Sequence, residues 1–228
     1  MQLSVSDLAE LCNVSESTVY RWVQEDGLPA EQVNSLYRVN PAELLEWATT
    51  RKLPVSSAIF QKLNGHSLGR SGLCDALELG GVVHNVAGDD RQAVLTALVE
   101  GIPLPNGFAS ETLVQLLVAR ERMSSTAVGD GIAIPHPRNP VVLPGAQRVL
   151  RVAYLSQPID FGAADGKLVD TLFLMICPTV HNHLQLLARL ASVLRKDAFR
   201  KLLAQRPDKN KLIEAMQAEE RALVEEAA

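Results

Sequence analysis

The chain has 228 residues, of which 47% are apolar and 21% charged, and its net charge is −4 at pH 7. This composition is typical of a globular protein of one or two domains, and its slight negative charge favours neither nucleic acid nor an anionic membrane as partner. No signal-like N-terminus is present, and no apolar run approaches the ~20 residues that a membrane-spanning helix needs. The three cysteines lie far apart without a CxxC spacing, so we expect reduced thiols and no metal site. These features predict a soluble, cytoplasmic protein.

The segment 3–28 predicts two short helices joined by a tight turn. Ser4 is a suitable N-cap, and Asp7 stands three residues later, where the acid of a capping box belongs. Asn13, in the turn, is one of the few non-glycine residue types that tolerate a left-handed backbone. Ser15 then caps the second helix.

A short wing and a third helix are expected next. Leu36–Val39 is typical of a strand, and Asn40, Pro41 and Glu43 supply the following helix with a cap, an N1 proline and an acid in its first turn. The order of helix, turn, helix and wing resembles the excisionase/MerR-like helix-turn-helix family. We therefore expect residues 1–55 to form a small winged helix-turn-helix domain.

In that family the second helix enters the major groove of DNA. Its outward side chains, the candidates for DNA contact, would be Glu16, Ser17, Tyr20, Arg21 and Gln24. Residues 1–52 contain four basic and eight acidic residues, a net charge of −4. Affinity for DNA depends largely on neutralising phosphates, so we expect weak DNA binding by this domain alone. A helix-turn-helix that serves only protein contacts is an equal alternative.

The second part of the chain alternates between helices and strands. The stretch 53–66 contains Pro54, Ser56, Ser57, Asn64 and Gly65, so residues 56–66 are expected to be a linker and residues 67–222 a second domain. Helices are expected near 68–79, 89–100, 110–122, 182–194, 196–205 and 209–224, and strands near 81–86, 148–155 and 169–176. The pattern predicts an α/β (α+β) fold in which helices flank a mixed sheet.

The segment 120–137, RERMSSTAVGDGIAIPHP, contains the candidate chemistry. It passes from a helix end through Gly129 and Gly131, which leave room for an anion, to His136 between two prolines. Proline keeps the residue before it extended, so the backbone that presents the imidazole is stiff. A neutral imidazole is a competent nucleophile, and phosphoryl transfer needs positioning and positive charge. The planar fork of Arg120 can supply that charge.

Three blocks resemble the fructose/mannitol/nitrogen-type IIA family of the phosphotransferase system, and they occur in the family's order. They are Arg-Glu-Arg-Met-x-Ser-Thr with GDGIAIPH, then Pro158-Ile159-x-Phe161-x-x-x-Asp165-x-x-x-Val169, then His183-Leu184-x-x-Leu187-x-x-Leu190. The resemblance implies that His136 is the phosphorylated histidine, Arg120 the phosphate-binding arginine and His183 a partner imidazole at the start of a helix. Thr126, in the same loop, is a candidate hydroxyl donor to the phosphate. Pro137 stands where the family usually has glycine, which removes one backbone N–H beside the site.

The resemblance implies a phosphohistidine carrier without a cofactor, rather than an enzyme with its own small-molecule turnover. It would accept phosphate from an HPr-type phosphocarrier and pass it to a IIB component, or signal to a regulatory target protein. The chain shows neither a membrane span nor a catalytic-looking cysteine loop, which favours the nitrogen-regulatory branch over sugar transport. One alternative is a DNA-binding transcription regulator that uses the IIA domain as its sensor. Another is an interaction protein in which Pro137 prevents phosphorylation; a homo-oligomer is also open.

Overall fold

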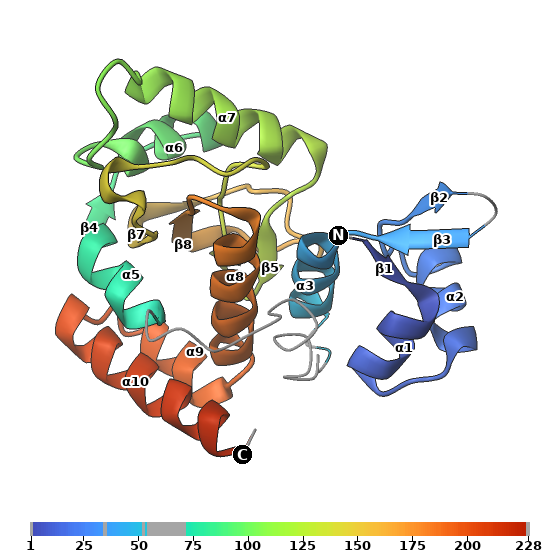
Figure 1. Cartoon of the computed structure of the whole chain (residues 1–228). Coiled ribbons are helices and arrows are strands. Elements are labelled where there is room, and N and C mark those ends of the chain that lie inside the picture. The colour runs from blue at the N-terminus through green and yellow to red at the C-terminus, as the bar shows by residue number, and fades with distance from the viewer. Residues whose placement is uncertain (1, 34–35, 52, 54–71, 227–228) are drawn as a thin grey trace.

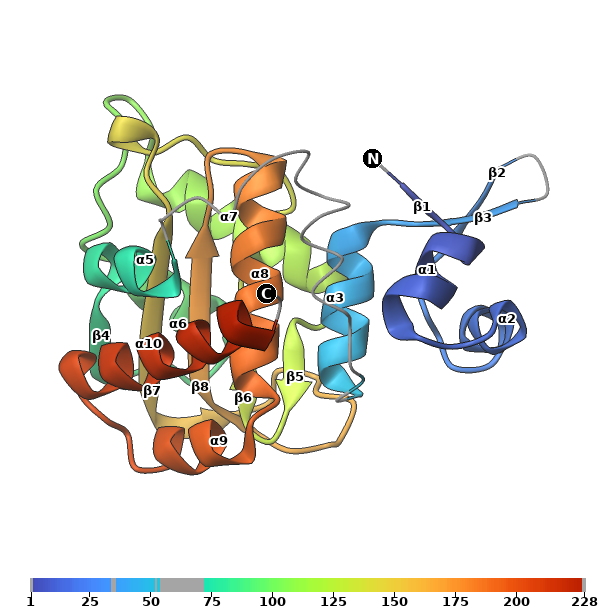
Figure 2. The same cartoon turned by 60° about the horizontal axis from the view of Figure 1, so that its bottom comes forward.

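The computed structural model describes residues 2–33, 36–51, 53 and 72–226, and it contains two sheets (Figures 1 and 2). The small antiparallel sheet has the order β1 (Leu3–Ser4), β3 (Leu36–Val39), β2 (Glu31–Val33). The large sheet has the order β4 (Val82–Val86), β7 (Val149–Ile159), β8 (Val169–Ile176), β6 (Ile132–Ala133), β5 (Ala127–Gly129). In the large sheet β4 pairs with β7 and β6 with β8 in parallel, whereas the other two pairs are antiparallel. The prediction of a mixed sheet with flanking helices is confirmed.

The capping signals of the N-terminal helices are confirmed. Before α1 (Val5–Cys12), the Ser4 hydroxyl accepts a hydrogen bond from the Asp7 N–H at 3.2 Å, and the Asp7 carboxylate accepts one from the Ser4 N–H at 2.9 Å. Asn13 ends this helix with a φ of 53°. The second helix, α2 (Glu16–Gln24), follows directly, so the helix-turn-helix is formed by local backbone chemistry.

The third helix, α3 (Pro41–Thr50), bridges the two parts of the chain. It lies beside β5 and α8 (Val180–Leu194) of the second part (Figures 1 and 2). It also contacts the end of α2, because the ring of Trp47 lies 5.0 Å from that of Trp22 and its Nε1 donates to the Asp26 carbonyl at 3.1 Å. Motion of α3 relative to α8 would therefore be transmitted to α2.

Side chains of the central strands alternate between two helix-covered faces. One face packs against α5 (Leu73–Gly80), α8, α9 (Asp197–Leu203) and α10 (Lys209–Glu226); its strand residues include Leu150, Val152, Tyr154, Phe173 and Met175. The other packs against α6 (Arg91–Val99) and α7 (Ser110–Met123); its strand residues include Val149, Ala153, Leu155, Leu172 and Leu174. None of the helices described is both long and apolar enough to cross a membrane.

The expected helices and strands of this part are present among the described residues. The first helix is described from Leu73 onward, and the expected linker at 56–66 lies outside the described residues. β7 extends to Ile159, beyond its expected end at residue 155. Segments of two or three residues are too short to show a periodic pattern. The sequence therefore did not predict the short strands β1, β2, β5 and β6, or the 3-10 turn Pro144–Ala146.

The end of α5 lies against β7 at a distance that only glycine permits. A Cβ on Gly80 would lie 2.0 Å from the Leu150 carbonyl oxygen. Gly80 is the last helical residue, and the chain turns at Gly81, whose φ is 73°. The helix therefore ends one residue beyond its expected end at residue 79.

Beside this junction, the buried Arg151 of β7 binds the C-terminal ends of two helices. Its Nε donates to the Gly80 carbonyl of α5 at 2.8 Å, and its Nη1 donates to the Leu98 carbonyl of α6 at 2.9 Å and to that of Glu100. A cation at helix C-termini is favoured by the helix dipoles and satisfies carbonyls that have no partner within the helix. Arg151 thus joins β7 to the helices on its two sides.

Candidate functional site

The two glycines of the motif form a tight hairpin. Between β5 and β6, Asp130 and Gly131 have φ values of 52° and 78°, the positive values that a type I′ turn needs at both central residues. Gly129, just before them, has a φ of 82°. Gly131 therefore suits the turn and Gly129 the strand end before it, because both adopt a backbone that other residue types rarely adopt.

His136 follows β6 on a segment fixed to β8. The Ile134 N–H donates to the Thr126 carbonyl at 3.0 Å, and the Pro135 carbonyl accepts from the Met175 N–H at 2.9 Å. The His136 side chain is buried, and its Nδ1 lies 2.8 Å from the Ile134 carbonyl oxygen. A carbonyl oxygen can only accept, so Nδ1 bears a proton and Nε2 is the ring nitrogen available for chemistry.

Arg120 lies in the last turn of α7, with its side chain buried. Its Nη1 donates to the backbone carbonyl of Ser124 at 2.9 Å and lies 3.2 Å from the Ser124 hydroxyl. These contacts hold one arm of the guanidinium, while the Nη2 arm pairs with an anion from another part of the chain.

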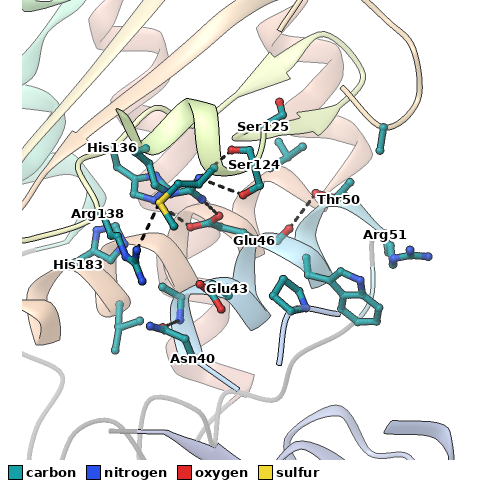
Figure 3. A pocket seen from close by; sticks show the side chains of 18 of the residues that line it. Asn40, Glu43, Glu46, Thr50, Arg51, Ser124, Ser125, His136, Arg138 and His183 are labelled. Carbon is teal, nitrogen blue, oxygen red and sulfur yellow. Dashed lines mark hydrogen bonds and ion pairs between the residues drawn. The ribbon is translucent and has the colours of Figure 1, made fainter. Parts of the chain in front are cut away.

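That anion is Glu46 of α3, which the sequence analysis did not single out. Its Oε2 accepts a hydrogen bond from Arg120 Nη2, and its Oε1 lies 3.0 Å from His136 Nε2 (Figure 3). Burial raises the pKa of the Glu46 carboxyl, but the His136 imidazole and the Arg120 guanidinium outweigh burial and bring that pKa below its usual value. Glu46 is therefore ionised at neutral pH.

The imidazole of His183 lies beside the imidazole of His136. The two ring centroids are 4.8 Å apart and the rings are tilted by 46°. Burial, and to a smaller extent His136, lower the pKa of His183 to about 3, so this ring is neutral at physiological pH. The helix begins at Val180, and the His183 N–H already donates to the Thr179 carbonyl at 3.0 Å. The His183 N–H is therefore used within the helix.

Thr126 is not brought to His136. Its hydroxyl donates to Glu121 at 2.6 Å and its N–H donates to the other oxygen of the same buried carboxylate at 2.9 Å. Thr126 and Glu121 thus stabilise the turn after α7.

The candidate DNA-contacting residues form a separate group. They are exposed on α2 and comprise Glu16, Ser17, Tyr20, Arg21 and Gln24. The Tyr20 ring lies 6.0 Å from that of Tyr37, and Arg21 Nε lies 3.9 Å from the Asp26 carboxylate. None of the group lines the cleft that contains His136.

A cleft of about 1170 Å³ lies between α3 and the loops of the second part, and Arg120, His136 and His183 line it together with Glu46. Within the described ranges, no group of three or more His, Cys, Asp or Glu residues is arranged to hold a metal ion. Arg120 pairs with the carboxylate beside His136, and Arg51, Arg138 and Lys167 also line the cleft. The arrangement joins a nucleophilic ring nitrogen, a cationic fork and a neutral second imidazole around one position that now contains a carboxylate.

Comparisons with known proteins identify the families of the two parts of the chain. The family model of the phosphoenolpyruvate-dependent sugar phosphotransferase system, EIIA 2, matches residues 77–219, and a helix-turn-helix domain model matches residues 3–52. The chain is 38% identical over 128 residues to a nitrogen regulatory protein of Pseudomonas aeruginosa, covering 54% of this chain and 80% of that protein. It is 36% identical over 88 residues to a fructose-like EIIA component of Escherichia coli, covering 38% and 57%.

Among solved structures, IIA-Ntr from Neisseria meningitidis shares the fold. The TM-score is 0.56 at 22% identity, and the match covers 63% of this chain and 98% of that one. The family match covers more than half of the chain. The chain therefore belongs to the EIIA 2 family of the phosphoenolpyruvate-dependent sugar phosphotransferase system and contains a helix-turn-helix domain in front of its EIIA domain.

Proposed function

We propose that this chain accepts a phosphoryl group on Nε2 of His136 from an HPr-type phosphocarrier and acts as a nitrogen-type regulatory protein. The observation that carries the proposal is the convergence of His136, Arg120 and His183 on one position where an anion is held. Relatives from Pseudomonas aeruginosa and Bradyrhizobium diazoefficiens, which are 38% and 39% identical in the matched segments, are named nitrogen regulatory proteins. They favour a regulatory role over sugar transport.

The transfer follows from the hydrogen bonds of the ring. The lone pair of His136 Nε2 attacks phosphorus while the N–P bond of the carrier's phosphohistidine breaks, and the carrier imidazole keeps the electron pair. The proton on Nδ1 stays bound to the Ile134 carbonyl, which disperses the positive charge that the ring gains. Arg120 neutralises the phosphoryl oxygens, and the neutral His183 ring can donate an N–H to one of them.

Labelling tests the proposal directly. The full chain would be incubated with phosphoenolpyruvate, its upstream enzyme and an HPr-type phosphocarrier, and acid-labile phosphate would be measured. We expect His136→Ala to lose this phosphate completely, because the nucleophile is absent. His181→Ala, an exposed histidine of the first turn of α8, is the matched control and should retain it. Phosphate at the wild-type level in His136→Ala would contradict the proposal.

A second candidate function is DNA-binding regulation with the EIIA domain as sensor. The observation that favours it is the exposure on α2 of Ser17, Tyr20, Arg21 and Gln24, the positions that face DNA in helix-turn-helix proteins. The net charge of −4 in residues 1–52 opposes tight binding by one copy, and two copies would add their few basic contacts.

We expect full-length protein to bind mixed-sequence duplex DNA only weakly, with a Kd of about 10⁻⁴ to 10⁻⁶ M. Few basic side chains are available to neutralise phosphates, so raising the salt concentration from about 50 to 200 mM should abolish the binding. Fluorescence anisotropy at both salt concentrations measures this. Tight, salt-resistant binding would refute the charge argument, and no binding at low salt would favour a helix-turn-helix for protein contacts.

A further inference from the structure

We propose that Glu46 is an internal competitor for the phosphoryl group: α3 closes the site of the unphosphorylated chain, and phosphorylation of His136 releases α3. This inference rests on the proposed function. It begins from an arrangement that joins the two domains, since Glu46 comes from the helix-turn-helix segment and its partners come from the EIIA domain.

The Glu46 carboxylate occupies both positions that a phosphoryl group needs. Oε2 accepts a hydrogen bond from Nη2 of Arg120, the guanidinium nitrogen that Ser124 does not hold. Without Glu46 this Nη2 would be available to bind phosphoryl oxygens. Oε1 lies 3.0 Å from His136 Nε2, and Nε2 is the atom that must form the bond to phosphorus. A covalent N–P bond is far shorter than this contact, so a phosphoryl group and the carboxylate cannot occupy the position together.

The contact with Glu46 also occupies Nε2, the nucleophilic nitrogen of His136. His136 Nδ1 faces the Ile134 carbonyl at 2.8 Å, and Nε2 faces the ionised Glu46 carboxylate. Both neighbours are acceptors, so both hydrogen bonds form together only when the ring bears a proton on each nitrogen. A ring that makes both hydrogen bonds has no free lone pair on Nε2. While α3 is docked, the carboxylate therefore blocks the position that phosphorus must reach.

Phosphorylation reverses the balance of charge in the cleft. Once α3 opens, the Nε2 proton passes to water and the freed lone pair bonds to phosphorus, so about −1.5 to −2 charges stand where a proton had bound Glu46. The Glu46 carboxylate would then face a like charge in a buried position, and Arg120 would be shared between two anions. The packing of α3 against α8 and β5 opposes release, so the contact behaves as a latch with two states.

Release of α3 from the EIIA domain would be transmitted to the helix-turn-helix domain through Trp47, the residue next to Glu46. Trp47 packs on Trp22 and donates to the Asp26 carbonyl, so α3 and the end of α2 are mechanically linked. Movement of α3 away from α8 therefore changes where α2 and its exposed side chains lie relative to the EIIA domain.

The first test measures the rate of phosphorylation of the full chain by the charged phosphocarrier. We expect Glu46→Ala to raise the initial rate about 10-fold or more, because a closed state that dominates the open one lowers the apparent affinity for the donor by the same factor. Glu16→Ala, at an exposed position of α2 that does not line the cleft, is the control and should keep the wild-type rate. Glu46→Gln keeps the shape but not the charge, and should give an intermediate rate.

The second test measures the position of the helix-turn-helix domain. Spin labels on Glu25→Cys and Gln217→Cys, at exposed positions after α2 and on α10, would report the distance between the two domains. The three native thiols are buried, and burial raises the pKa of Cys12 to about 11 and those of Cys74 and Cys177 to about 12, so they label poorly.

We expect one narrow distance distribution in the unphosphorylated wild type, and a broadened or shifted one in the phosphorylated wild type and in unphosphorylated Glu46→Ala. If no variant accepts phosphate, the proposed function fails, whereas the distance in Glu46→Ala still tests the latch because that arm needs no phosphate. A wild-type distance distribution in Glu46→Ala, together with a wild-type rate, would overturn the inference.

Discussion

Replacing Arg120 with lysine is expected to slow phosphoryl transfer to His136 by about 10²-fold, although the positive charge is kept. The guanidinium uses one arm to bind Ser124 and directs the other at the anion-binding position. A single ammonium group cannot make both sets of contacts in fixed directions. Lysine would therefore leave either the turn or the phosphoryl oxygens without a donor.

The measurement needs a background in which the latch is absent. Arg120 also holds Glu46, so a change at Arg120 in the wild type would open the site while it weakened phosphate binding. We would compare kcat/KM for transfer in Glu46→Ala and in Glu46→Ala with Arg120→Lys. Arg122→Lys, an exposed arginine on the same helix, should have no effect. Equal rates with and without Arg120→Lys would show that Arg120 does not bind the transferring group.

Replacing Arg151 with methionine is expected to lower the free energy of unfolding by about 3 kcal/mol. The substitution keeps much of the apolar volume but leaves the carbonyls of Gly80, Leu98 and Glu100 without their donor. A buried acceptor without a partner costs about 1–3 kcal/mol, and the removal of a buried cation offsets part of the total. The burial that lowers the pKa of Arg151 is the source of that offset.

Urea unfolding would measure the loss, and a fall in Tm of about 6–12 °C should accompany it in a protein of this size. Arg148→Met is the matched control. That arginine lies just before β7 and is half-buried, and its side chain makes a single long contact of 3.5 Å with Gln185. If both variants lost the same stability, the loss would not arise from the carbonyls that Arg151 binds.

Much of the fold could be predicted because its signals are local. The capping box of Ser4 and Asp7 and the left-handed Asn13 act within one turn of helix, so neighbouring residues suffice to determine them. The nearly continuous apolar runs of β7 and β8 predict strands that are buried on both faces. Strands β5 and β6 were missed because their positions depend on hydrogen bonds to β8 and on a two-residue turn.

The candidate site was predicted only in part, for a related reason. His136, Arg120 and His183 belong to blocks with a family pattern, and the structure brings them together. Thr126 belongs to the same loop, but its hydroxyl donates a hydrogen bond to the buried carboxylate of Glu121 instead. Which partner a short polar side chain chooses depends on the packing around it.

The sequence by itself determined the two domain types, the order of their main helices and strands, and the identity of the candidate nucleophile. Only the tertiary structure showed that the Glu46 carboxylate contacts that nucleophile, Nε2 of His136. The two residues are 90 positions apart, and Glu46 is one of 26 acidic residues without a distinguishing local pattern. Its contact with His136 exists because α3 docks against α8 and β5 of the EIIA domain. Such docking depends on the shapes of two distant surfaces, which no local spacing of residues encodes.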